Sequence, residues 1–510
     1  MTAAIAESTQ DATATTADLP PGFRIRVRAD ADWYELLEPG ERLIVGGSPL
    51  RAVRLTAAAT DLLGDGTLTV CDRASAGLAR RLLDGNLADP ALGPPVDAGD
   101  LTVVIPVRDR PDQLDQCLTA VAGLEVIVVD DASLDRPAVH DVVRRHGARL
   151  VSLPENVGPA GGRNAGLAEV STPYVAFVDS DITVDPATLL GLAGHFADPR
   201  VALVGPLVEG VVRSERPRWF ERYDAAASSL ALGRRSCSVA PGAAVGWLPG
   251  ACLVALTDAL RGPEGVDGFA ADLRVGEDVD LVWRLVAAGW RVRYEPAFQA
   301  SHDVRPTLRA WLGRKVVYGT GGAPLAQRHG DAVAVARLSP LMAAAGAGVL
   351  LRRPWSAALA VGATAWAARS VRGTLPAMPT RNTLAACLAA KGLGWSVRQE
   401  SALILRHWWP AAVAGCLISR TVRRATVSAL VVDAIVAAAV DRPLPAPESP
   451  DLGFVAGWVG RRLDDVAYGG GLWIGAVRHR AWGALAVTTV RSGRSRTKRV
   501  AQPRGTGTVS

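Results

Sequence analysis

The sequence predicts an α/β protein: a doubly wound, mostly parallel sheet, preceded by a small α+β domain and followed by a helical region. Three continuous apolar runs, at 101–107, 125–129 and 174–178, alternate with helix-like stretches. Strands that read as continuous apolar runs are typical of a parallel sheet covered on both faces. After about residue 334 the strand-like runs give way to Ala/Val/Leu-rich helical segments, which predict the helical region.

At 510 residues the chain is too long for one hydrophobic core, so we expect two or three domains. A Thr/Ala-rich lead without a continuous apolar run predicts disorder rather than a signal peptide. Alternating patterns and a glycine turn mark the small domain, and a Pro/Gly/Asp-rich linker follows it at 89–100. The predicted organisation is a disordered lead (1–20), a small N-terminal domain (21–90), a catalytic domain (100–330), an apolar helical region (334–440), and a linker, C-terminal segment and basic tail (441–510).

Composition excludes several classes of protein. The formal net charge of +6 is modest over this length: it could favour anionic lipid or phosphate ligands, but it gives no signal for a nucleic-acid partner. The six cysteines lack CxxC spacing, so neither a zinc site nor a disulfide framework is predicted, and a reducing cytoplasm is the default compartment.

The helical region permits two interpretations. Its apolar segments, each flanked or interrupted by charged residues, are shorter or more broken than the roughly 18–20 apolar residues of a clear membrane span. A buried helical bundle and membrane contact are both open, and the flanking arginines Arg352, Arg353 and Arg420 to Arg424 favour the membrane. We therefore expect the chain at the cytoplasmic face of the cell membrane. The predicted helical segments are 338–351, 355–368, 402–418 and 425–440.

Carboxylates follow the predicted strands in an ordered series. Asp109 follows the first strand, Asp130 and Asp131 end the second, and Asp179 and Asp181 follow the third. Ligands of open parallel sheets bind at the carboxyl ends of the strands. A single acidic residue after a strand is commonly only a helix cap. Acidic residues after three strands, however, would repel each other at one edge of the sheet unless they shared a cation. A divalent metal, Mg²⁺ or Mn²⁺, that also binds a diphosphate is therefore predicted.

Further candidate residues lie outside this series. The glycine-rich stretch 156–166 contains Arg163, whose planar fork suits phosphate or sugar oxygens. Glu277 and Asp278 begin a helix-like run, where acids are favoured by the helix dipole but could also supply a general base. His302 ends a strand-like run near the same edge, where a surface role is the alternative.

Together these motifs resemble the inverting glycosyltransferases of family 2, which have the GT-A nucleotide-diphospho-sugar transferase fold. The matching stretches, in the family's order, are TVVIPV, VIVVDDAS, NVGPAGGRNAGL, YVAFVDSDI and GEDVDLVWRL, followed by the late histidine. The first strand departs from the family by ending in Val107-Arg-Asp-Arg, and the QxxRW signature of processive synthases is not evident.

The resemblance implies a role for each matched residue. It implies uracil or ribose contacts for Asp109 and Asp131, and diphosphate or sugar contacts for Arg163. Asp278 is implied to be the catalytic base that accepts the acceptor's proton, and the donor is implied to be a UDP-sugar. For the other matched residues it implies substrate contact by Asp179 and Glu277 and metal binding by Asp181 and His302.

A closer resemblance is to the subgroup of family 2 that serves mycofactocin biosynthesis in actinobacteria. It rests on the catalytic motifs together with GERLIVGGSPLR at 40–51 and YGTGGAPLAQRH at 318–329. This implies transfer of glucose from UDP-glucose to a peptide-derived small molecule, forming a β-1,4-linked chain. Residues 21–90 also resemble PqqD-like winged-helix peptide-recognition domains, with an ordinary accessory domain as the alternative. Two further functions stay open: a family 2 enzyme acting on a lipid or cell-wall glycan, and a binding scaffold without catalysis.

Overall fold

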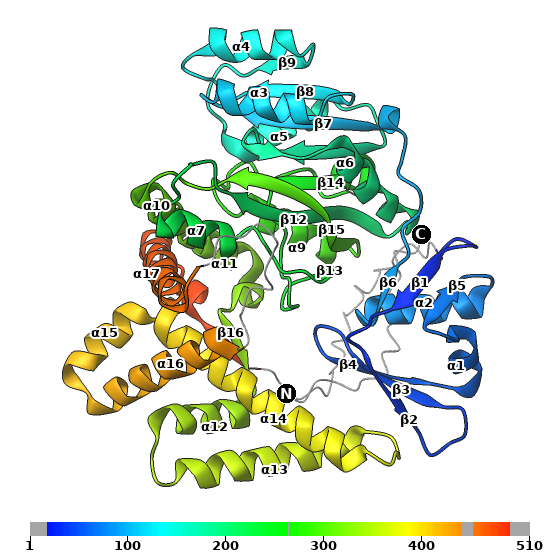
Figure 1. Ribbon diagram of the computed structural model, residues 1–510, viewed down its shortest axis with the longest axis vertical. Coiled ribbons are helices and arrows are strands. Elements are labelled where there is room, and N and C mark those ends of the chain that lie inside the picture. Colours follow the sequence, from blue (N-terminus) through cyan, green and yellow to red (C-terminus); the bar gives the residue numbers. More distant parts are fainter. Residues whose placement is uncertain (1–17, 264, 440–451, 490–510) are drawn as a thin grey trace, which may run out of the picture.

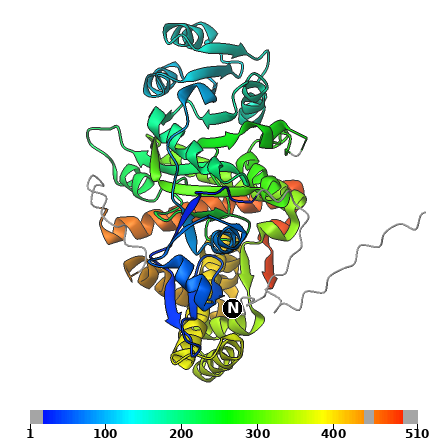
Figure 2. The same cartoon turned by 90° about the vertical axis from the view of Figure 1, so that its right-hand side faces the viewer.

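The computed structural model describes residues 18–263, 265–439 and 452–489. The α/β unit lies at one end of the molecule, and the N-terminal domain and the helical region lie together at the other end (Figures 1 and 2). The predicted linker at 441–450 and the basic tail at 491–510 fall outside the described residues, as do residues 1–17 of the lead.

The α/β unit is built on one nine-stranded sheet. Its order is β11-β15-β12-β14-β10-β7-β8-β9, with β13 paired to β15. The strands are β7 (Leu101–Val107), β8 (Glu125–Asp130), β9 (Arg149–Ser152), β10 (Tyr174–Val178), β11 (Ile182–Thr183), β12 (Val201–Val211), β13 (Cys237–Val239), β14 (Cys252–Leu256) and β15 (Arg291–Asp303).

The sheet is parallel over the half that the apolar runs predicted. Strands β10, β7, β8 and β9 are all parallel, whereas β14 runs antiparallel to both β10 and β12. The three predicted strands of this half are confirmed nearly to the residue. The other half is mixed because β14, which the sequence analysis did not single out, enters the centre of the sheet.

Helices cover both faces of this sheet, as expected for a doubly wound unit. Alternate residues of β7 and β10 enter two separate cores, so that Val103 packs on one face with α3, α4 and α6 and Val104 packs on the other with α5, α8 and α9. The helices are α3 (Pro111–Ala120), α4 (Arg136–Arg145), α5 (Gly158–Ala168), α6 (Pro186–Ala193), α7 (Trp219–Ala226), α8 (Thr257–Arg261), α9 (Glu277–Ala287), α10 (Leu308–Thr320) and α11 (Gly322–His329).

Helix α5 lies close to the sheet because its inner face carries glycine. A β-carbon at Gly166 would overlap the Val104 side chain and crowd Val129. The close approach brings Arg163, one turn earlier on the same helix, beneath the carboxyl ends of the strands. The glycine-rich stretch therefore positions a side chain as well as a loop.

The N-terminal domain consists of two antiparallel three-stranded sheets and two helices. The sheets have the orders β5-β1-β6 and β2-β3-β4. Ion pairs fasten the domain to the α/β unit, at 2.7 Å between Arg80 and Asp198 and at 2.8 Å between Arg293 and Asp89. The elements are β1 (Arg24–Val27), β2 (Asp32–Glu35), β3 (Arg42–Gly46), β4 (Arg51–Leu55), α1 (Ala57–Leu63), β5 (Thr67–Thr69), α2 (Arg73–Asp84) and β6 (Ala88–Pro90).

The C-terminal region is helical, but its helices differ from those predicted. The expected segment 402–418 is divided by a π-helical turn, Leu403–His407, because the next helix starts with Pro410 in its first turn and has no amide N–H there to continue the hydrogen-bond ladder. Two long helices, α14 and α17, were not predicted, because charged residues interrupt their apolar pattern. The elements are β16 (Ala336–Leu338), α12 (Pro340–Leu351), α13 (Ser356–Thr374), α14 (Arg381–Ala402), α15 (Trp409–Ile418), α16 (Arg420–Ala439), α17 (Phe454–His479) and β17 (Val487–Thr489).

Among the described residues, no single helix has both the length and the apolar composition of a membrane span. The pair formed by Arg381–His407 and Trp409–Ile418 meets both requirements together, with a bend of 89° between its two parts.

Candidate active site

Three of the predicted acids lie at one edge of the sheet. Strands β7, β8 and β10 are parallel neighbours, so their carboxyl ends share that edge. Asp109, Asp131 and Asp179 each follow one of these ends within two residues. The order of strands therefore produces the acidic edge that the sequence predicts.

Arg163 connects two of the acidic motifs through a buried guanidinium. Its Nη2 donates to Asp179 at 2.7 Å and its Nη1 donates to Glu277 at 2.9 Å, while its side chain is 3% exposed. Nη2 also donates to the carbonyl of Gly250 at 3.1 Å. Burial opposes the charge, but the two carboxylates outweigh it and raise the pKa of Arg163. The contact with diphosphate or sugar remains a prediction; in this structure the guanidinium is occupied by protein carboxylates.

Asp278 lies next to this cluster and is held by backbone amides. The amide of Gly250 donates to its Oδ2 at 2.9 Å, and the amide of Val279 donates to its Oδ1 at 2.8 Å. Burial, followed by the charge of Glu277, raises the pKa of the carboxyl to about 7, while the two amides and Arg163 oppose the rise. Asp278 is thus a fixed carboxylate whose pKa lies near neutrality, as a general base requires.

Asp181 lies just before β11, and His302 lies on the neighbouring strand β15. Ile182 pairs with His302 between β11 and β15, and Asp181 directly precedes Ile182. Among the described residues, the buried Nδ1 of His302 has no hydrogen-bond partner, and imidazole nitrogens are common metal ligands. Asp181 accepts from Nη1 of Arg110 at 2.6 Å. The described residues contain no cluster of three metal-binding side chains, and metal binding by Asp181 and His302 stays a prediction.

Three arginines around Asp179 and Asp181 were missed by the sequence analysis. Nη2 of Arg305 lies 3.8 Å from Oδ2 of Asp181, the carboxylate oxygen that Arg110 also contacts. Burial opposes the charge of Arg314, but Tyr318, Asp179 and Asp181 raise its pKa. Arg110 is the last residue of Val107-Arg-Asp-Arg, the stretch in which the first strand departs from the family pattern. That departure was the one sequence feature that could have pointed to Arg110. Arginines close to these acids make the site suitable for an anionic diphosphate.

Asp109 and Asp131 hold loops at the same edge. Asp131 accepts the amides of Val157 and Gly158, at 2.7 and 2.9 Å, and so fastens the start of α5 to the end of β8. Asp109 has a left-handed backbone with φ of 55° and accepts the amide of Leu134. Their contacts to uracil or ribose stay predictions.

The stretch YGTGGAPLAQRH supports the helix that carries Asp278. It forms the end of α10 and helix α11, and His329 Nε2 lies 2.8 Å from the buried Asp280 of α9. Arg284 also donates to Asp280, at 2.7 Å. A cavity of about 420 Å³ lies beside this contact, with Arg274, Thr320 and Arg328 among its lining. The motif therefore anchors α9 from the side of the helical region.

Two family models match the chain. The family model of glycosyl transferase family 2 matches residues 102–236, and that of glycosyl transferase family group 2 matches residues 174–416. The first match contains Asp109, Asp131, Arg163, Asp179 and Asp181, and the second extends through α9, His302 and the YGTGGAPLAQRH stretch to α15.

Relatives and solved structures extend the comparison. A mannosyltransferase from Pyrobaculum calidifontis, solved with GDP-Man and Mn²⁺, is 17% identical with a TM-score of 0.38, and the match covers 75% of this chain and 90% of that one. An uncharacterized glycosyltransferase of Mycobacterium tuberculosis is 32% identical over 223 residues, covering 42% of this chain and 93% of the relative. The pre-mycofactocin glycosyltransferase of Mycobacterium tuberculosis is 40% identical over 481 residues, covering 92% of this chain and 98% of the relative. The chain therefore belongs to glycosyltransferase family 2 and, within it, to the glycosyltransferases of the mycofactocin system.

Proposed function

We propose that the chain transfers glucose from UDP-glucose to pre-mycofactocin and, by repeated transfer, builds a β-1,4-linked glucan on this peptide-derived acceptor. The acceptor follows from the name of the 40% identical relative, whose similarity extends over nearly the whole of both chains. The observation that carries the chemistry is the pair of amide contacts that fixes Asp278 beside the arginine-linked acids.

The proposed reaction is a single displacement at the anomeric carbon. The acceptor hydroxyl oxygen forms a bond to this carbon while the bond to the UDP phosphate oxygen breaks, and Asp278 takes the hydroxyl proton. Attack opposite the leaving group converts an α-linked donor into a β-linked product. A bound divalent metal would stabilise the negative charge on the departing diphosphate, and Asp181 and His302 are the residues that would hold it.

Asp278→Asn should abolish proton acceptance but leave donor binding intact. We expect kcat to fall by about 10²–10⁴-fold, with an unchanged Kd for UDP-glucose. In the wild type, log(kcat/KM) should rise with pH up to about 7 and then level off, because the raised pKa keeps Asp278 protonated below that pH. Stopped assays across a pH series measure both effects. Asp258→Asn, which changes an exposed carboxylate on α8, serves as the control. Near-normal turnover by Asp278→Asn would assign the base to another residue.

Removal of the metal should stop transfer without unfolding the protein. We expect excess EDTA to abolish activity, added Mn²⁺ to restore it, and Asp181→Ala to be inactive with or without Mn²⁺. Manganese electron paramagnetic resonance in the presence of UDP should detect binding to the wild type and weaker binding to Asp181→Ala and His302→Ala. Thermal unfolding provides the control for folding. Full activity in excess EDTA would refute the metal proposal.

The acceptor can be tested with purified components. Incubation with UDP-glucose and pre-mycofactocin should give a series of products separated by one hexose in mass spectrometry, and a β-1,4-glucosidase should digest them. Deleting the gene should remove the same series from cell extracts. An intact series in the deletion strain, with a changed lipid or cell-wall glycan profile, would instead favour another family 2 activity.

The helical region supports a proposed location at the cytoplasmic face of the membrane, where UDP-sugars are made. Helix α15 is apolar, yet none of its residues is buried, and Leu417 and Ile418 at its end are 80% and 89% exposed. Arg420, Arg423 and Arg424 follow at the start of α16. An apolar helix next to arginines is suited to the interface of an anionic bilayer.

Leu417→Glu with Ile418→Glu should weaken membrane binding. Burying each apolar side chain contributes about 1.5–3 kcal/mol, so we expect the double variant to stay in solution when the wild type floats with vesicles containing anionic phosphatidylglycerol. Leu134→Glu is the control, because Leu134 is 88% exposed but belongs to the α/β unit. If all three proteins float equally, or if none of them floats, α15 does not bind the membrane.

A further inference from the structure

One residue without a side chain connects the arginine-linked acids to Asp278. Gly250 lies two residues before β14 and is buried. Its amide donates to Oδ2 of Asp278 at 2.9 Å, and its carbonyl accepts from Nη2 of Arg163 at 3.1 Å. The carbonyl of the next residue, Ala251, accepts the amide of Asp179 at 2.9 Å. Gly250 and Ala251 therefore contact both acidic motifs through their backbone and set how far apart these motifs lie.

The space beside Gly250 is filled by the Arg163 guanidinium. A β-carbon at position 250 would lie 3.0 Å from Nη2, 3.2 Å from Cζ and 3.3 Å from Nη1 of Arg163. The guanidinium has little freedom to withdraw, because it binds two carboxylates and its Cζ lies 5.3 Å from the centre of the Phe269 ring. Phe269 is 2% exposed and exchanges two hydrogen bonds with Asn164, at 2.8 and 2.7 Å. Gly250 does not have a left-handed backbone, so this contact, rather than its φ angle, is what requires glycine.

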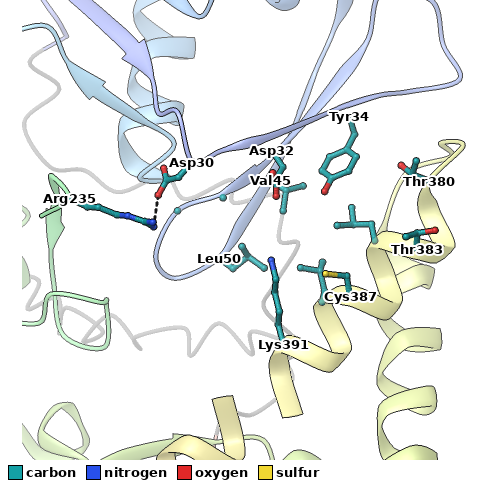
Figure 3. Close-up of a pocket in the computed structure, with 14 residues that line it drawn as sticks. Asp30, Asp32, Tyr34, Val45, Leu50, Arg235, Thr380, Thr383, Cys387 and Lys391 are labelled. Carbon is teal, nitrogen blue, oxygen red and sulfur yellow. Dashed lines mark hydrogen bonds and ion pairs between the residues drawn. The ribbon is translucent and has the colours of Figure 1, made fainter. Parts of the chain in front are cut away.

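The backbone around Gly250 is also fixed. Strand β14, which follows it, pairs with both β10 and β12. In the segment that precedes it, the carbonyl of Gly246 accepts from Nε1 of Trp283 on α9 at 2.7 Å. Farther back, Arg235 forms an ion pair of 2.9 Å with Asp30 of the N-terminal domain, beside a cavity that both residues line (Figure 3). A side chain at position 250 would therefore displace either the guanidinium or the amide beside it.

We propose that Gly250 is a positioning residue for glycosyl transfer, which orients the Asp278 carboxylate through its amide and can do so only without a side chain. Glycine has wide conformational freedom, but the bonds to Arg163 and Asp278, on either side of the α-carbon, restrict its rotation. The amide N–H therefore points in one direction, and Asp278 keeps one orientation toward the acceptor. The inference rests on the proposed function, since it explains how the base proposed there is held.

The contacts of Gly250 predict two kinetic effects of its displacement. A misplacement of about 1 Å can cost about 10²-fold in rate, so kcat should fall while donor binding stays unchanged. Burial and the charge of Glu277 raise the pKa of Asp278, whereas the amides of Gly250 and Val279 and the charge of Arg163 lower it. Moving the Gly250 amide or the guanidinium away removes a contact that lowers this pKa. The pH at which kcat/KM reaches half its plateau should then rise above its wild-type value of about 7.

The first test is Gly250→Ala in the full-length protein. With UDP-glucose and pre-mycofactocin as substrates, we expect kcat to fall by about 10–100-fold and the half-plateau pH to rise by about one unit. The Kd for UDP-glucose should keep its wild-type value, which also verifies folding. Gly246→Ala is the matched control, because it adds the same methyl group to the same segment, where the nearest atom is the Ala240 carbonyl oxygen at 3.9 Å. This control should retain the wild-type kcat and pH profile.

The second test is Arg163→Lys, which changes the same contact without adding an atom at position 250. Lysine keeps the positive charge but lacks the guanidinium that crowds Gly250. Arg163→Lys alone should also lower kcat and raise the half-plateau pH, because the Gly250 carbonyl loses its partner. When the two changes are combined, their effects should not add: in the Arg163→Lys background, Gly250→Ala should lower kcat by less than about threefold.

The outcomes separate this inference from the proposed function. If Asp278→Asn is inactive but Gly250→Ala and Arg163→Lys keep the wild-type kcat and half-plateau pH, the base stands and the positioning role is refuted. The role is also refuted if Gly250→Ala lowers kcat equally in both backgrounds, or without a change in the half-plateau pH, because either result describes a purely structural defect. If Gly250→Ala does not fold, a raised half-plateau pH in Arg163→Lys supports the role and an unchanged one refutes it. If Asp278→Asn retains turnover, the proposed base fails and the role of Gly250 fails with it.

Discussion

The active site depends on one buried cation. Asp179, Glu277 and Asp278 come from the end of β10 and the start of α9, and uncompensated carboxylates at this spacing would repel each other. The Arg163 guanidinium, delivered from α5, donates to two of them and to the Gly250 carbonyl. Removing one partner of a buried ion pair costs about 3–5 kcal/mol. The position of α5, fixed by Gly166 against the sheet, thus decides whether these acids can share one edge.

The first turn of α9 shows how the catalytic unit is joined to the rest of the chain. Near its start, Glu277 is bound to Arg163, whereas Asp280 one turn later is bound to His329 of α11. Asp278 lies between these contacts, so its position depends on the sheet and on the helices that lead into the C-terminal region. The proposed general base, Asp278, is therefore placed by contacts from two structural units.

The sequence was informative where a signal was local and continuous. Apolar runs gave β7, β8 and β10 nearly to the residue, and the residues that follow them are at the expected edge. Other features depend on contacts between distant residues. No local pattern marks β14 as a central antiparallel strand, and none shows that Arg163 faces Asp179 and Glu277. Helices α14 and α17 were missed because their charged residues resemble breaks in an apolar pattern; in α17, Asp464 pairs with the distant Lys315.

The packing of α17 has a consequence for how the protein is made. Gly319 on α10 lies against the backbone of Tyr468, and Lys315 on the same helix forms a 2.7 Å ion pair with Asp464. Strand β17, which follows α17 in the chain, pairs with β16. Ribosomes add about 5–20 residues per second, so α10 waits several seconds for the segment that covers it. The glycosyltransferase unit of the nascent chain stays unfinished until synthesis has passed the helical region, and chaperones have that interval in which to shield its open surface.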